Sequence, residues 1–196
     1  MSNFIDVLND MRTHYKNNIS NGLAIPYYPD LVEDALNLEE ASSKFFITSD
    51  KNDSDSENAI VHEKLNDLQN KAKSISVDTA STIEDELKKV SKNSAGSNSA
   101  FRDELNRIRE DAKKKAADNI DKIFDEAQKI GETFPKTKNL ILVTAQKINQ
   151  LINDLISKLV DYIVKIVENV VLWLKTAWDS ITSTFNGIKN WILHWF

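Results

Sequence analysis

The feature that most constrains the fold of this chain is an apolar stripe within its last 58 residues. Apolar side chains recur there at sixteen positions, with an average step of 3.6 residues from the first to the last. This is the period of a straight α-helix, in which residues three or four apart share one face. The stripe consists of Ile141, Ala145, Ile148, Ile152, Leu155, Leu159, Ile163, Ile166, Val170, Leu174, Ala177, Ile181, Phe185, Ile188, Ile192 and Trp195. We therefore expect an apolar amphipathic helix over residues 139–196.

The stripe also repeats every eleven residues. Eleven residues make about three helical turns, so the apolar face stays aligned over a long distance with little twist. Such a face suits a flat partner. One phase of the repeat reads Ile141, Ile152, Ile163, Leu174, Phe185 and Phe196, and residues 99–134 repeat it more weakly through Phe101, Ala112, Ile123 and Phe134.

This 11-residue pattern resembles that of apolipoprotein-like, synuclein-like and perilipin-like proteins. The resemblance is one of pattern alone and covers residues 101–134 and 139–196. It implies binding to a membrane, a lipid particle or a lipid droplet. The apolar face here is denser in Ile, Val and Trp than those helices often have, and this density also suits burial against protein in a coiled-coil-like bundle.

The most apolar stretch, residues 159–178, does not predict an autonomous transmembrane helix. Its thirteen aliphatic or Trp residues would favour insertion by roughly 5 kcal/mol, whereas its four charged residues would oppose insertion by roughly 10 kcal/mol. No 18-residue window between 139 and 196 is free of charge. We expect peripheral association with a membrane or a lipid-particle surface.

All four tryptophans, at positions 173, 178, 191 and 195, fall within the last 24 residues. Trp favours the boundary between water and acyl chains, although Trp173 and Trp178 would equally suit the core of a bundle. Residues 182–187 are weak helix formers, so a break there is an alternative to one straight helix.

The rest of the chain predicts an all-α protein, either an elongated helical bundle or a helical hairpin, with the long C-terminal helix of 11-residue periodicity. Residues 1–49 read as short helices, about 3–18 and 30–41, around a connection with Pro26 and Pro29. Residues 50–57 form an acidic linker. We expect two polar amphipathic helices over residues 58–134, at about 58–94 and 99–134, with a break of the first at "VDTAS" as an alternative.

The composition offers little chemistry. There is no Cys, the three His are far apart, and no nucleophile, phosphate-binding or metal motif is present. We expect no enzyme activity, cofactor, metal or small-molecule substrate. The net charge of −5 and the lack of a basic stripe argue against nucleic acid. The N-terminus lacks the pattern of a secretory signal peptide.

Two functions follow. The first is a non-enzymatic protein that associates with a membrane or lipid surface, with membrane disruption or pore formation through the Trp-rich end as a variant. The second is a structural or partner-binding bundle, in which the stripe is core and the interface of a homo-oligomer. In either case the contact residues are Ile141, Ile148, Ile152, Leu155, Leu159, Ile163, Ile166, Val170, Trp173, Leu174, Trp178, Ile181, Phe185, Ile188, Trp191, Ile192, Trp195 and Phe196.

Overall fold

The computed structural model describes residues 4–27, 56–92 and 98–195, with the backbone alone at 56–58, 98 and 171–175. The described residues form α-helices and one short 3-10 helix, so the all-α prediction is confirmed. The elements are α1 (Phe4–Asn21), α3 (Ser56–Lys92), α4 (Asn98–Thr133), η1 (Pro135–Thr137), α5 (Lys138–Glu168) and α6 (Val170–Trp195). The expected helix at 30–41 and most of the expected linker at 50–57 lie outside the described residues.

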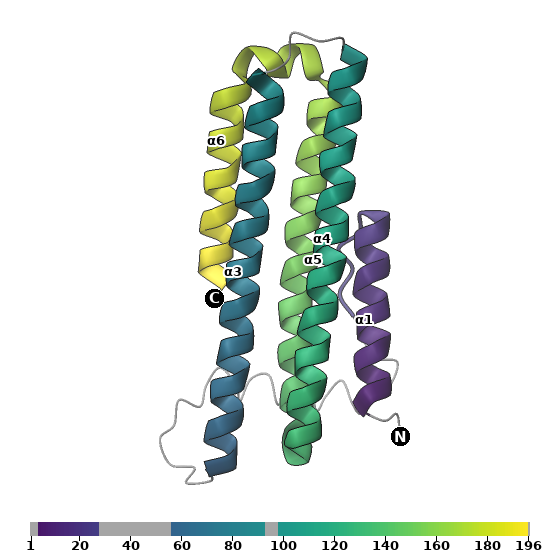
Figure 1. Cartoon of the computed structure of the whole chain (residues 1–196), viewed down its shortest axis with the longest axis vertical. Helices are drawn as coiled ribbons and strands as arrows, with labels where there is room; N and C mark the ends of the chain where they lie inside the picture. Colours follow the sequence, from purple (N-terminus) through teal and green to yellow (C-terminus); the bar gives the residue numbers. More distant parts are fainter. Residues whose placement is uncertain (1–3, 28–55, 93–97, 196) are drawn as a thin grey trace.

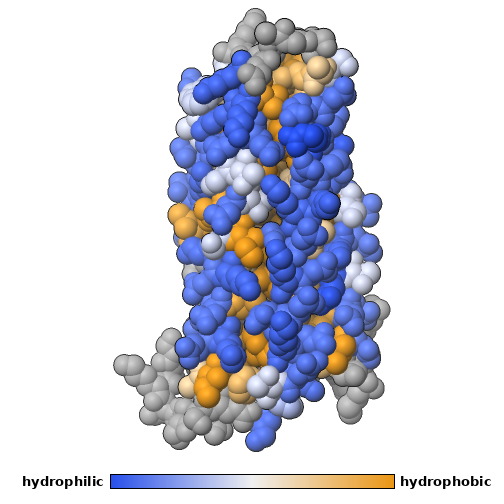
Figure 2. Space-filling model, in the orientation of Figure 1, coloured by the Kyte–Doolittle hydropathy of each residue, from blue (hydrophilic) through white to orange (hydrophobic). Residues whose placement is uncertain are grey.

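The four long helices form an up-down-up-down bundle (Figure 1). Around the bundle, α3 packs on α4, α4 on α5, α5 on α6, and α6 back on α3. The shorter α1 lies outside this square and packs against α4 and α5. The described surface facing the viewer is mostly hydrophilic, but an apolar seam runs along the long axis between hydrophilic flanks (Figure 2).

The core consists of the apolar stripes that the sequence contains. On α1 the buried stripe is Phe4, Leu8, Met11, Tyr15 and Ile19, each separated from the next by three or four residues. The helix ends in a Schellman motif at Gly22, whose φ of 68° suits a residue without a Cβ atom. In this motif Gly22 N donates to the Ile19 carbonyl and Leu23 N to the Asn18 carbonyl.

Helix α3 is continuous from Ser56 to Lys92, so the alternative of a break at "VDTAS" is not what forms. Thr79 lies in that stretch, and its hydroxyl donates to the carbonyl of Ile75 one turn earlier, so its polar group is satisfied within the helix. Ala80 within this stretch and Ile83 just after it are buried in the core. Burial of the apolar face therefore outweighs the weak local propensity.

The expected single helix over 139–196 is instead two helices, and the joint lies at Asn169 rather than at 182–187. Asn169 has φ −118° and ψ 35°, and its N–H donates to the carbonyl of Lys165. Residues 182–187 stay helical because Ile181, Phe185 and Ile188 around them are buried, which compensates for weak helix formers. In Figure 1 the first turns of α6 cross the end of the bundle before the helix descends beside α3.

Candidate lipid- or partner-contacting surface

The expected contact stripe forms the core of the bundle in this structure. The stripe keeps its helical spacing across the joint between α5 and α6. Ile166 on α5 and Val170 on α6 are separated by four residues, as they would be on one face of a single helix. The side chains of Trp173 and Leu174, and all of Phe196, lie outside the described part of the chain. The buried members are Ile141, Ile148, Ile152, Leu155, Leu159, Ile163, Ile166, Val170, Ile181, Phe185, Ile188 and Ile192.

The three described tryptophan side chains lie at the edge of this core. Trp178 is 48% exposed and Trp195 is 50% exposed, whereas Trp191 is half-buried. The rings of Trp191 and Trp195 meet edge to face with their centroids 6.1 Å apart. Leu193 adds an exposed apolar side chain to the same end of α6. The C-terminal end of α6 is thus an exposed aromatic and apolar site.

Lysines from the neighbouring helices lie over two of these rings. Lys88 Nζ and Lys92 Nζ, both near the end of α3, are 5.0 and 4.8 Å from the centre of the Trp178 ring. Lys158 Nζ on α5 is 5.2 Å from the centre of the Trp191 ring. Each of these rings therefore contacts a cation across a helix–helix interface, which is a favourable cation–π arrangement.

A buried ionic cluster joins α3 to α6. The Glu84 side chain is only 8% exposed and accepts hydrogen bonds from Lys189 Nζ on α6 and Lys88 Nζ on α3, at 2.6 and 2.5 Å. Burial alone would raise the pKa of Glu84, but the hydrogen bonds from Lys189 and Lys88 outweigh it and lower the pKa. Glu84 is therefore ionised at neutral pH and stabilises the attachment of α6 to α3.

Helix α1 covers the other side of α5 through polar contacts. Asn153 Nδ2 donates to the carbonyl of Tyr15 (3.0 Å), and the Tyr15 hydroxyl donates to the carbonyl of Gln146 (3.3 Å). Gln146 Nε2 in turn donates to the carbonyl of Tyr27 (2.9 Å) in the segment after α1. These bonds fix α1 and the residues that follow it against the middle of α5.

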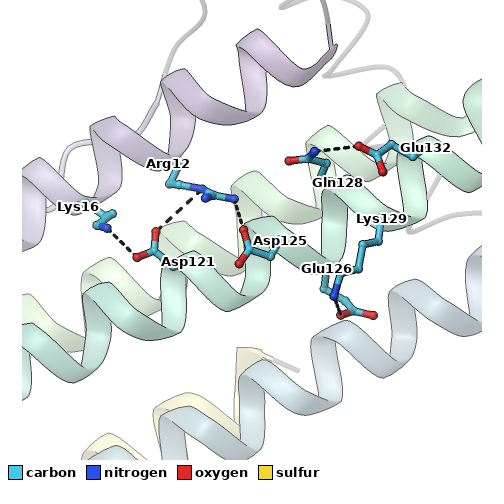
Figure 3. Close-up of polar contacts among 8 residues, drawn as sticks. All are labelled: Arg12, Lys16, Asp121, Asp125, Glu126, Gln128, Lys129 and Glu132. Carbon is cyan, nitrogen blue, oxygen red and sulfur yellow. Dashed lines mark hydrogen bonds and ion pairs between the residues drawn. The ribbon is translucent and has the colours of Figure 1, made fainter.

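Ion pairs bind an adjacent side of α1 to α4. Arg12 lies between two aspartates of α4 and forms its shorter ion pair with Asp125, at 2.6 Å, and Lys16 pairs with Asp121 at 2.6 Å (Figure 3). All four side chains are partly exposed, so each pair contributes at most about 1 kcal/mol. The ion pairs orient α1, and its buried apolar stripe supplies most of the stabilisation.

The core of the bundle also contains polar atoms that it does not fully satisfy. Asn149 Nδ2 donates to the carbonyl of Ala145, and Asn153 Nδ2 donates to Tyr15. The Oδ1 atoms of Asn149 and Asn153 have no hydrogen-bond partner among the described residues. Close by in sequence, burial raises the pKa of Asp154, and a hydrogen bond from Gln150 only partly offsets it. Such groups cost free energy in the closed bundle.

Several of these residues were missed by the sequence reasoning. A second buried face of α5, which includes Leu142, Ile156 and Val160, lies off the predicted stripe. The signal for it was the high apolar density of residues 140–167, because a helix that is apolar on more than one side is buried. Glu84 could not have been found, because it resembles the solvated acids Asp85 and Glu86 beside it.

The fold defines the class of protein as an up-down helical bundle with an added N-terminal helix. Comparisons with protein-family models, with curated proteins and with solved structures find no match. Within the described ranges no helix is long and apolar enough to cross a membrane. Nor do the described residues contain a group of His, Asp or Glu side chains that could hold a metal ion.

Proposed function

We propose that this protein is a non-enzymatic helical bundle that associates with a membrane or lipid surface. To do so, α5 and α6 separate from each other and from the rest of the bundle. One observation carries the proposal. The apolar stripe continues in phase from Ile166 on α5 to Val170 on α6, although the helices lie on opposite sides of the joint at Asn169. A bundle needs only that each helix has an apolar face of its own. It does not need the spacing of apolar residues to continue from α5 to α6, whereas one continuous helix does.

A small change would produce that helix. If Asn169 took up helical dihedral angles, residues 138–195 would form one helix of 58 residues, about 87 Å long at 1.5 Å per residue. One apolar face of this helix would contain the stripe that the bundle now buries. Lipid would replace helix–helix contacts of similar apolar character, so the closed and open states can lie close in free energy.

Two further features support opening. The Oδ1 atoms of Asn149 and Asn153 have no partner in the described bundle, and such atoms would gain hydrogen bonds at a hydrated lipid surface. In addition, Trp178 and Trp195 are about half exposed before any opening. They supply a first contact with the interfacial zone of a bilayer, which Trp prefers.

Membrane disruption is a variant of the same proposal. The exposed face of α5 contains Lys158, Asp161, Lys165 and Glu168, spaced by three or four residues. In a homo-oligomer of opened chains, these residues would line a water-filled hole while the stripe contacted lipid. Leakage of a dye from vesicles distinguishes this variant from a surface coat.

A second candidate, a structural or partner-binding bundle, is favoured by the burial of every described member of the stripe from Ile141 to Ile192. In that case the stripe is simply core, and the exposed aromatic end of α6 docks onto another protein or a second copy of this chain.

The test is to hold α5 and α6 together. Tyr162 on α5 and Ser180 on α6 are in contact, with 3.2 Å between their hydroxyl oxygens. Because the chain has no Cys, the double variant Y162C/S180C can be joined selectively with a short bismaleimide. The matched control is the same variant with each thiol capped by N-ethylmaleimide. Far-UV circular dichroism verifies that both forms remain helical.

We expect the capped form to bind vesicles with a blue shift of Trp emission, and the cross-linked form to bind far more weakly. Equal binding by both forms would refute opening of the α5–α6 pair. No response of the wild-type chain to any vesicle would refute lipid association and favour the partner-binding bundle.

A further inference from the structure

The tryptophans on α6 lie on two different flanks of the helix. Trp178 faces α3, where Lys88 and Lys92 cover its ring, and Trp191 faces α5, where Lys158 covers its ring. Both described seams between α6 and its neighbours therefore present a Trp–Lys group at the surface of the bundle. A lysine near an interfacial Trp ring can reach the level of lipid phosphates, because its long stem stays apolar while its ammonium group stays wet.

Two of these lysines are available for an anion. Lys88 is committed to Glu84. By contrast, neither Lys92 nor Lys158 forms an ion pair within 4.0 Å with a described carboxylate, although Asp154 one turn earlier on α5 attracts Lys158 through its charge. Lys92 and Lys158 are also exposed to solvent. Their contacts with the rings leave the rest of each ammonium group open to solvent or to a ligand.

The other basic candidate in the sequence is less suitable. The run at 113–115 is the densest basic stretch of the chain. Lys113 at its start donates to the carbonyl of Ser20 and pairs with Glu110, at 3.2 and 3.6 Å. This lysine therefore helps to hold α1 against α4. Among the described contacts, it does not lie over a Trp ring.

The overall charge of the protein, −5, would repel an anionic surface, so any attraction must be local and oriented. Around Trp178 the side chains sum to +1, from three cations and two anions: Lys88, Lys92, Lys189, Glu84 and Asp179. At the Trp191 seam, Lys158 contributes a further exposed cation. The surroundings of Trp178 are thus locally basic, whereas at Trp191 one exposed lysine lies beside the ring and Asp154 partly offsets its charge.

We infer that the lipid surface bound by this protein is an anionic bilayer, and that the closed bundle recognises its phosphate-bearing headgroups through Lys92 and Lys158, beside Trp178 and Trp191, before α5 and α6 separate. This inference rests on the proposed function and specifies its lipid. Each lysine near an anionic leaflet contributes a fewfold increase in affinity, so the loss of both should weaken binding roughly 30-fold.

The experiment compares K92Q/K158Q with a matched control, K64Q/K114Q. Lys64 and Lys114 are exposed on α3 and α4 and contact no described tryptophan ring. Both double variants change the net charge of the full chain from −5 to −7. The probes are vesicles of phosphatidylcholine alone and of phosphatidylcholine with phosphatidylglycerol, and binding is followed by flotation and by Trp emission.

We expect wild-type protein to bind the anionic vesicles more tightly than the neutral ones. K92Q/K158Q should lose roughly 30-fold in affinity for the anionic vesicles, and K64Q/K114Q should lose much less. Equal losses in the two variants, or equal binding of wild type to both vesicle types, would overturn the inference while lipid association stands. Absence of binding to either vesicle would overturn both.

Discussion

The substitution Gly131→Ala tests whether α1 is docked as the structure describes. Gly131 lies on α4 directly below the ring of Phe4, the first residue of α1. A Cβ atom at position 131 would lie 2.3 Å from both Cε1 and Cζ of that ring. Ordinary van der Waals contact needs about 1 Å more than this, so the ring must move. Phe4 is only 8% exposed, and its displacement exposes a large apolar side chain.

The magnitude follows from two opposing effects. Expelling the Phe4 ring costs about 1.5–3 kcal/mol of burial, whereas alanine favours the helix by about 1 kcal/mol relative to glycine. The net loss in the free energy of unfolding is about 0.5–2 kcal/mol. Gly187 on α6 is the matched control, because an added Cβ there has nothing within 4 Å. Gly187→Ala should therefore stabilise the protein by about 1 kcal/mol.

Urea unfolding of wild type, G131A and G187A measures both effects, and amide hydrogen exchange locates the loss. In G131A the amides of α1 should lose protection first, while those of α5 change little. The reasoning is refuted if G131A gains stability as G187A does, since Phe4 would then not lie against Gly131.

Two carboxyl groups give opposite pH dependences. Glu84→Gln should cost about 2 kcal/mol at pH 7, because the charged acceptor of Lys189 is lost. The folded-state pKa of Glu84 is lowered, so this contribution is fully present above its unfolded pKa of about 4 and decreases as the pH falls through the lower folded-state pKa; a difference between the variant and wild type that stays constant from pH 7 to 3 would contradict the assignment. Asp154→Asn should instead stabilise the protein at pH 7, because burial raises the pKa of Asp154. That gain should vanish below about pH 4, where wild-type Asp154 is protonated, and a loss of stability at pH 7 would count against it. Urea midpoints of each variant and wild type from pH 3 to 7 measure both effects.

The expected helix boundaries were close where local signals are strong. The expected helix over 99–134 corresponds to α4, Asn98–Thr133, which ends just before Phe134 and Pro135. Proline cannot continue the helix because it lacks the N–H group and restricts the residue before it. Likewise, the expected helix over 3–18 corresponds to the first part of α1, which continues to Asn21.

The candidate site was predicted only in part. The stripe and the tryptophans were identified by spacing and by residue type. The lysines over Trp178 and Trp191 were not, because Lys92 and Lys158 are 86 and 33 residues away from these rings in the sequence. Contacts between helices depend on how the helices are arranged, and the period of one helix does not contain that information.

The sequence by itself determined the helical class and the apolar face of each described helix, because both follow from a 3.6-residue period that every helix shows alone. Only the tertiary structure decided that the stripe bends back at Asn169, that α1 covers the second face of α5, and that Glu84 holds α6 to α3. The reason is physical. An apolar face must be buried, but other helices and lipid can bury it equally well. Which of them does so depends on how the other helices of the chain pack against that face.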